Sequence, residues 1–311
     1  MKYTAVSLHL DSLGHGYGFP QRYKDPTFFE VSERFLKIAQ KYNFKYTIYI
    51  IGKDLEKSEN RERVNHWASE GHEIGNHSWL HLENLGALNK SIIRREVEAA
   101  HEIITKIVGR EPKGFVAPAW TSSSQLEKIL IELNYKHDSS GFPSWILFPA
   151  LLKILLSNLK NAKSFKIFHR KDYLYWLFGP RNPYNNVGNL FKACDSSQNK
   201  HITMLPVPTN KYRVAFWHTL VFMFGWDIYE KLLKSCLKEN FFYFVIHPAD
   251  LMDERDLTSD FKPRINIARI KQPSLAVKME YIEKSIELII RSGRKIITMG
   301  ELAAYTSSQS Y

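Results

Sequence analysis

Cysteine is scarce in this sequence, and long apolar runs are missing. Only Cys194 and Cys236 occur, which excludes a disulfide framework and fits a reducing compartment. No stretch reaches about 18 uninterrupted apolar residues, so the sequence predicts no transmembrane helix. Asp11 interrupts the first apolar run early, which argues against a signal peptide. We therefore expect a cytoplasmic protein.

Acidic residues are also in deficit. The chain has 32 of them against 43 lysines and arginines, which gives a net charge of +11. Such a balance favours acidic partners, namely nucleic acid, anionic lipid or phosphate-bearing substrates. The basic residues do not gather in a known nucleic-acid-binding module, so we expect no nucleic-acid partner. Hydrophobic residues make up 44% of the 311 residues, enough for a sizeable core.

Hydrophobic patterns of strand and helix type alternate along most of the chain. This order predicts a parallel sheet or a β/α barrel, with its chemistry at the carboxyl ends of the strands. We expect a single domain, 1–311, with one insertion at about 142–213. The predicted strands are 5–10, 44–51, 73–75, 114–117, 135–138, 202–207, 241–246 and 295–298, and the predicted helices are 28–42, 60–70, 89–108, 123–133, 228–238, 274–291 and 299–305.

The predicted insertion has an unusual composition. Residues 145–159 are strongly apolar, and lysines mixed with aromatic residues follow them. Asp172 is the only acidic residue between 142 and 178. This mixture is typical of an interfacial segment, and it indicates peripheral contact with the inner membrane through 142–178. The alternative is a core helix followed by lysines on a solvated face.

Three histidines fall within eleven residues, at His72, His77 and His81. Neutral imidazole is the commonest side-chain metal ligand. If the segment is helical, His77 and His81 share one face and can reach one ion. Such a pair is half of a zinc site and needs a further ligand, often a carboxylate. The alternative is a chance pair on a polar face. Asp11 and Asp138 lie, like His77, at the ends of predicted strands, which groups them with the pair.

Five segments stand in a characteristic order. They are Asp11, Asn76-His77-Ser78-x-x-His81, 115–120, Asp138-Ser139-Ser140 and His247-Pro248. This order resembles the polysaccharide deacetylases, the NodB-homology family. Because of 178–184 and 246–251, the later half is similar to a branch of that family linked to cell-envelope glycolipids. The resemblance implies a distorted (β/α)7-type barrel.

The resemblance also implies a reaction. Active members remove acyl groups from sugars with a divalent metal, here expected to be zinc, with nickel, cobalt and manganese as alternatives. The substrate would be an N-acetyl or N-formyl sugar of an envelope polysaccharide or a lipid-linked saccharide. The implied roles are Asp11, His77 and His81 as metal ligands, Asp11 as the catalytic carboxylate, His247 as the general acid, the Ala119 amide at the oxyanion, Trp120 as a sugar-pocket wall, and Asp138 near the site as a partner of His247.

Two positions differ from the family pattern. The family has two carboxylates at the first motif, a base and a metal ligand, but only Asp11 is present here. Either Asp11 binds metal and the base is missing, or Asp11 is the base, Ser12 or Leu13 stands at the ligand position, and His15 is a substitute ligand. Val116 replaces an arginine that orients the catalytic carboxylate. Two alternatives follow: a degenerate barrel that binds a sugar or glycolipid, or a metal-independent amidohydrolase on the same fold.

Overall fold

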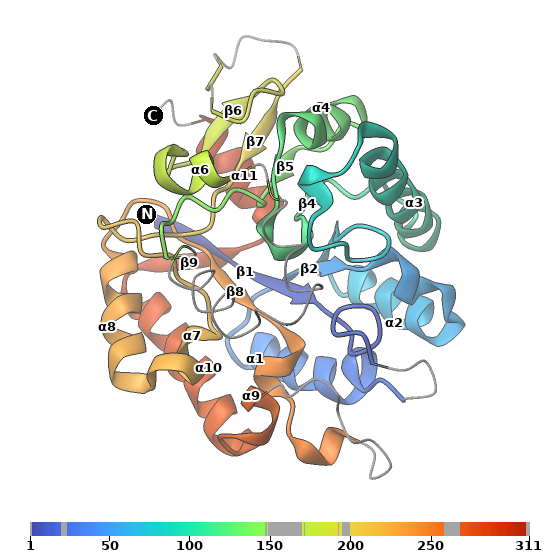
Figure 1. Ribbon diagram of the computed structural model, residues 1–311. Helices are drawn as coiled ribbons and strands as arrows, with labels where there is room; N and C mark the ends of the chain where they lie inside the picture. Colours follow the sequence, from blue (N-terminus) through green and yellow to red (C-terminus); the bar gives the residue numbers. More distant parts are fainter. Residues whose placement is uncertain are drawn as a thin grey trace, which may run out of the picture.

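The computed structural model describes residues 2–19, 24–146, 148, 170, 172–191, 193–194, 200–257 and 268–308. They form an α/β fold in which helices surround a barrel-like sheet (Figure 1). Most of the apolar segment 145–159 and the lysines after it lie outside the described residues. Among the described residues, no helix has both the length and the apolar character needed to span a membrane.

The sheet is parallel except at one edge. Its order is β6-β7-β5-β4-β3-β2-β1-β8, and β9 also pairs with β1. Only the pairing of β6 with β7 is antiparallel among the described strands. The two edge strands are not joined in this order, so the sheet is a half-barrel. The strands are β1 (Lys2–Leu10), β2 (Thr47–Ile50), β3 (Glu73–Asn76), β4 (Gly114–Phe115), β5 (His137–Asp138), β6 (Tyr184–Asn186), β7 (Ile202–Met204), β8 (Phe244–Ile246) and β9 (Arg294–Ile297).

Strand β1 lies in the middle of the fold, with β2 and β8 as neighbours. Its side chains alternate between two cores because successive residues of a strand point to opposite faces. Val6 and Leu8 belong to the larger core beneath the helices, whereas Ala5 packs in a separate cluster on the inner face of the sheet. The same period of two places His9 and Asp11 on the inner face.

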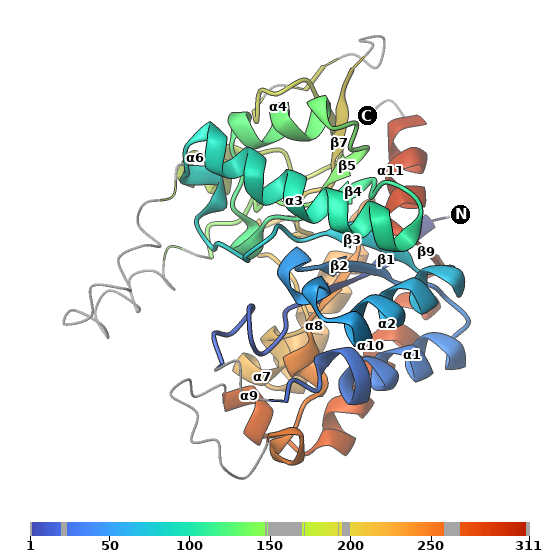
Figure 2. The ribbon, with the colours of Figure 1, turned by 90° about the vertical axis from the view of Figure 1, so that its right-hand side faces the viewer.

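Helices cover the outside of the sheet (Figure 2). The longest, α3, begins after Asn89 and ends at Gly109, whose φ of +74° suits glycine. The α-helices are α1 (Ser32–Lys41), α2 (Ser58–Ser69), α3 (Lys90–Val108), α4 (Ser124–Glu132), α6 (Tyr173–Phe178), α7 (Leu220–Phe224), α8 (Trp226–Leu237), α9 (Ala268–Lys271), α10 (Leu275–Arg291) and α11 (Met299–Ser308). A π-helix, Thr27–Val31, leads into α1.

The predicted α/β alternation and barrel class are confirmed, with one change in the later half. Strands β6 and β7 fall inside the predicted insertion 142–213 and extend the sheet. Residues 184–204 are therefore part of the barrel wall as far as they are described. Strand β6, Tyr-Asn-Asn, escaped prediction because a three-residue edge strand with polar side chains lacks a hydrophobic pattern.

Two buried carboxyl groups lie between α4 and β5. Glu127 and Asp138 are both fully buried. Burial and mutual repulsion raise the pKa of Glu127 well above its ordinary range, and burial raises the pKa of Asp138. The Asp138 carboxylate also accepts a hydrogen bond from the Ser140 hydroxyl at 2.5 Å. The folded protein therefore holds a proton on this pair at pH values where the unfolded chain has lost it.

This pair predicts a pH-dependent stability. Above the ordinary carboxyl pKa of about 4, the folded state binds more protons than the unfolded chain, so the free energy of unfolding falls as pH rises. Glu127→Gln removes one of the charges. We expect it to raise the free energy of unfolding by about 1 kcal/mol or more at about pH 8, and by less at about pH 5. Urea unfolding at both pH values measures the difference.

The matched control is Glu62→Gln on the exposed face of α2. It should leave the pH dependence of the parent protein unchanged. An unchanged pH dependence in Glu127→Gln would contradict the shared proton.

Candidate functional site

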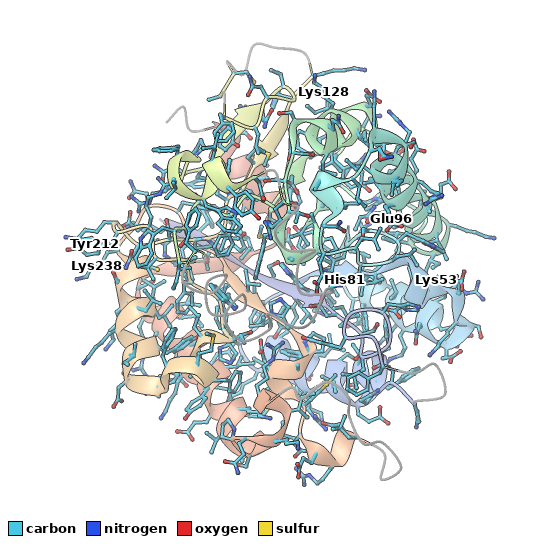
Figure 3. The ribbon with its side chains drawn as sticks, in the orientation of Figure 1. Lys53, His81, Glu96, Lys128, Tyr212 and Lys238 are labelled. Atoms are coloured by element: carbon cyan, nitrogen blue, oxygen red, sulfur yellow. The ribbon has the colours of Figure 1, made fainter. Side chains whose placement is uncertain are left out.

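A pocket of about 230 Å³ opens at the carboxyl ends of the parallel strands. Its wall combines histidines with aromatic residues and both signs of charge. His81 lies near the middle of this face in Figure 3. The lining residues are His9, Asp11, Gly16, Tyr17, His77, His81, Glu83, Ala119, Trp120, Trp217, Thr219, His247 and Arg269. Of the residues predicted for the site, only Asp138 is absent from this lining.

The predicted ligand atoms converge on the pocket wall. The Nε2 atoms of His77 and His81 lie 3.2 and 3.4 Å from Oδ1 of Asp11. One ligand atom from each of the three residues lies within 4.8 Å of the other two. Asp11 follows β1 and His77 follows β3, and both strands pair with β2, which brings their carboxyl ends together.

The two histidines do not share a helix, so the predicted helical spacing is wrong. The segment after β3 is an irregular turn in which Ser78 and His81 have φ values of +64° and +57°. The Asn76 side chain accepts from the Ser78 amide, and the Ser78 hydroxyl accepts from the His81 amide. These local hydrogen bonds offer the backbone an alternative to a helix. The turn brings both imidazoles to Asp11.

A hydrogen bond of His77 determines which of its ring nitrogens carries the lone pair that faces Asp11. Its Nδ1 lies 2.7 Å from the Val116 carbonyl, which can only accept, so Nδ1 donates. Burial lowers the pKa of His77, and a neutral ring then has a bare lone pair at Nε2. That lone pair faces Asp11 Oδ1, a buried oxygen without a hydrogen-bond partner among the described residues. Two facing lone pairs repel unless a cation lies between them, so the three residues suit a cation.

The charges of the other two ligands agree with this arrangement. Burial opposes ionisation of Asp11, but His81, His77 and His247 together outweigh it and hold the carboxyl pKa well below its ordinary range. Burial also opposes a charge on His81, but Asp11 outweighs it and raises the pKa of the imidazole. The site therefore keeps an ionised carboxylate at Asp11, although that side chain is only 13% exposed. Carboxylate and imidazole are common zinc ligands.

His247 enters the pocket from the end of β8 with its own polar support. Its amide donates to Oδ2 of Asp250 at 2.8 Å, and its Nδ1 lies 3.8 Å from the same oxygen. Burial opposes ionisation of Asp250, but Arg269 together with His247 and His218 outweighs it and lowers the carboxyl pKa. The Nε atom of Arg269 lies 3.4 Å from Asp250, and Thr219 donates to the same carboxylate. Asp250 thus stays ionised beside His247.

Comparison with known proteins agrees with this geometry. The family model described as polysaccharide deacetylase matches residues 24–137. A peptidoglycan-N-acetylglucosamine deacetylase of Bacillus cereus is 33% identical over 91 residues, which cover 29% of this chain and 32% of the relative. A peptidoglycan deacetylase of Helicobacter pylori is 30% identical over 107 residues, 34% of this chain and 36% of the relative. Residues 24–137 of this chain are thus similar to the polysaccharide deacetylase family.

Solved structures give the same fold over a longer stretch. A Mycobacterium smegmatis structure described as a polysaccharide deacetylase has a TM-score of 0.60 at 17% identity, covering 99% of this chain and 91% of that one. A CE4 family pseudoenzyme from Bacillus anthracis has a TM-score of 0.51 at 13% identity, covering 97% and 65%. These likenesses concern the fold alone. The matches to the two curated relatives span only about a third of each relative's length.

Within the family pattern, the structure favours one of the two alignments of Asp11. Its carboxylate lies with His77 and His81, where a ligand belongs. His9 precedes it by two residues on the same strand face, and its ring centre lies 5.3 Å from that of His77 and 5.1 Å from that of His247. Its Nε2 is buried without a hydrogen-bond partner among the described residues.

Sequence reasoning missed His9, although a signal was available. Asp11 was placed at a strand end, and the period of two in a strand puts residue 9 on the same side. His9 is 3% exposed and lines the pocket.

Neither His15 nor Val116 replaces the group that is missing from the family pattern. His15 contacts Asp54 through Nδ1 at 2.7 Å and does not line the pocket, so it is not the further ligand. Val116 contributes only its carbonyl to His77. A guanidinium reaches the pocket from Arg269 instead. The sequence did not predict that Arg269 lines the pocket, because this residue lies far from the family motifs in the chain.

The expected role of Asp138 near the substrate needs correction. Its carboxyl group is fully buried and contacts Ser140, and the Ser140 hydroxyl accepts from the Ala117 amide at 2.8 Å. Asp138 therefore supports the loop after β4 from behind. The carboxylate beside His247 is Asp250.

The loop after β4 is held in an unusual backbone conformation. Ala119 and Trp120 both have φ of +51°, which costs non-glycine residues of order 1 kcal/mol each. Arg170 donates to the carbonyls of both residues, at 2.8 and 2.9 Å. The guanidinium also pairs with Asp172, which accepts from the Ser122 amide. A buried ion pair thus holds the loop against the pocket.

This clamp predicts a two-step loss of stability. Arg170→Met leaves Asp172 buried without its cation, and we expect a loss of about 3 kcal/mol or more in the free energy of unfolding. The double variant Arg170→Met/Asp172→Leu removes both charges and should recover part of that loss. About 1 kcal/mol or more should remain, because the two loop carbonyls have lost their donor. Denaturant unfolding of the three proteins measures both steps. Full recovery in the double variant would contradict the role of Arg170 in the loop.

Proposed function

We propose that the protein is a hydrolase that removes an N-acyl group, acetyl or formyl, from a sugar of a cell-envelope polysaccharide or lipid-linked glycan. The observation that supports it most is the convergence of Asp11, His77 and His81 in a pocket that also contains His247. The named activities of the two peptidoglycan deacetylases are consistent with this proposal.

In this proposal Asp11, His77 and His81 hold a divalent cation, with zinc expected first and nickel, cobalt or manganese as alternatives. Such an ion polarises an acyl carbonyl and lowers the pKa of water toward neutrality. The chain supplies the proton transfers and the orientation of the substrate. Asp11 serves as a ligand only, so a different group has to accept the proton of the attacking water.

His9 is the proposed proton acceptor. Its ring lies beside His77 and His247 at the pocket wall, and its buried Nε2 has no other partner among the described residues. As a water proton passes to His9, the water oxygen forms a bond to the acyl carbon. The amide of Ala119 is the proposed donor to the resulting oxyanion, as the family resemblance implies.

His247 is the proposed acid on the opposite side of the reaction. It donates a proton to the sugar nitrogen as the bond between carbon and nitrogen breaks, which yields a free amine and a carboxylic acid. Asp250 accepts from the backbone amide of His247, and its carboxylate lies 3.8 Å from Nδ1 of the ring. Trp120 would pack against the apolar face of the sugar, since it lines the pocket.

A second candidate is a sugar-binding protein without turnover. The first motif has one carboxylate, Asp11, where the family has two, and a pseudoenzyme shares the fold. A third, a metal-independent amidohydrolase, would use the pocket without a cation. The two predictions below separate these candidates.

The first prediction concerns metal binding. We expect zinc to bind with a stoichiometry of one and to raise the unfolding temperature, because binding to the folded state alone stabilises it. Asp11→Asn should weaken binding by about 100-fold or more, since it removes the charged ligand. Isothermal titration calorimetry with zinc, nickel, cobalt and manganese measures this. His247→Ala, which changes a pocket residue outside the ligand set, should bind as the parent does. Equal affinity in Asp11→Asn would refute the ligand assignment.

The second prediction concerns activity and the proton acceptor that replaces the family's second carboxylate. Release of acetate or formate from soluble N-acylated sugars should fall by about 100-fold or more in His9→Phe and in His247→Ala. His9→Asp restores a carboxylate at this point of the wall and should keep far more activity than His9→Phe. His15→Asn is the control, because His15 lies outside the pocket and should be dispensable.

The pattern of results separates the three candidates. Metal binding without any acyl release would favour the sugar-binding protein. Activity that survives removal of metal by a chelator would favour the metal-independent hydrolase. Equal activity in His9→Phe and the parent would exclude His9 as the proton acceptor.

A further inference from the structure

Large apolar side chains stand exposed on helix α6, close to the pocket. Phe178 is 72% exposed and Leu174 is 63% exposed, and Leu177 adds to the same short helix. Monomeric soluble proteins rarely leave such groups together in water unless a partner covers them. The helix is linked to the site, because Arg170 and Asp172 at its start hold the Ala119–Trp120 loop.

Two further segments complete this first apolar ridge. The indole nitrogen of Trp145 donates to the Tyr212 carbonyl at 2.9 Å, and Arg213 donates to the carbonyl of Gly179 at the end of α6. Tyr212 is 66% exposed and projects at the edge of the molecule in Figure 3. Helix α6, Trp145 and the 210–213 turn therefore form one continuous surface, which we call ridge A.

A second apolar group lies next to another part of the pocket wall. Helix α7 begins directly after Thr219, a pocket residue that donates to Asp250. Met223 is 63% exposed, and Phe224 and Ile228 are exposed beside it. We call this group ridge B. In Figure 1, α6 and α7 both lie on the left of the picture, with α6 above α7.

A positive charge lies on ridge A. Lys211 is exposed next to Tyr212, with its ammonium group 4.9 Å from the ring centre. The sequence 149–169 contains four lysines and no acidic residue. The whole chain has a net charge of +11. Exposed aromatic and aliphatic side chains combined with lysine suit the interface of an anionic bilayer.

We propose that ridges A and B dock the protein on an anionic membrane surface, with the pocket, whose wall both ridges adjoin, facing the lipid headgroups. A bilayer is a single broad partner that can contact both ridges at once. Docking goes beyond the proposed function and does not depend on it. Where the proposed function also holds, a lipid-linked saccharide becomes the favoured substrate, because docking holds the mouth at the depth of its sugar.

Vesicle flotation tests the docking. Wild-type protein should float with vesicles of phosphatidylglycerol and phosphatidylcholine, bind pure phosphatidylcholine far less, and dissociate as salt rises. The double variant Leu174→Asp/Phe178→Asp on ridge A should lower the partition coefficient by about tenfold or more. Met223→Asp tests ridge B independently. The matched control is Ile290→Asp on α10, an exposed apolar residue away from both ridges, which should bind as wild type.

Circular dichroism and acyl release from a water-soluble substrate accompany each variant. Absence of flotation by the wild type would overturn the proposal, and so would equal flotation by both ridge variants and the Ile290 control. A dimer in solution that buries either ridge would overturn it as well. Vesicle binding without acyl release would refute the proposed function and leave the docking in place. Acyl release without vesicle binding would do the reverse.

Discussion

The Asp11 carboxylate, buried against two imidazoles, is the constraint on which the site depends. Parallel pairing of β1, β2 and β3 brings Asp11 and His77 to one end of the sheet, and a non-helical turn brings His81 beside them. The hydrogen bond from His77 to the Val116 carbonyl then turns a lone pair toward the carboxylate. Backbone pairing and one tautomer thus make a cation site from residues far apart in the sequence.

Much of this arrangement was predictable. The continuous apolar run in β1 reflects burial on both faces of a central strand, so this strand followed from the sequence. Asp11, His77 and His247 were expected at strand ends, and all three line one pocket. Short elements were missed, since β6 is a polar edge strand of three residues with too little pattern to predict.

The residues that support the site were harder to predict, because they depend on tertiary packing. Asp138 follows a strand like the other site residues, yet its side chain turns toward Glu127 and Ser140 behind the wall. Arg269 and Arg170 come from segments outside the family motifs, and each reaches a pocket element only through the folded chain. The sequence pattern indicates where a strand ends. It does not indicate which distant segment will bring a charged side chain to that end.

A histidine in place of a carboxylate as proton acceptor, as proposed for His9, also changes the electrostatics of the pocket. A second carboxylate beside Asp11 would add negative charge, whereas a neutral imidazole adds none. Asp250 is already matched by Arg269. A divalent cation bound through neutral imidazoles would be offset by Asp11 and by Glu83 of the pocket wall, so the pocket would be close to neutral. Anionic groups close to the acylated sugar, such as the phosphates of lipid-linked saccharides, would be repelled less by such a pocket than by one with a further carboxylate.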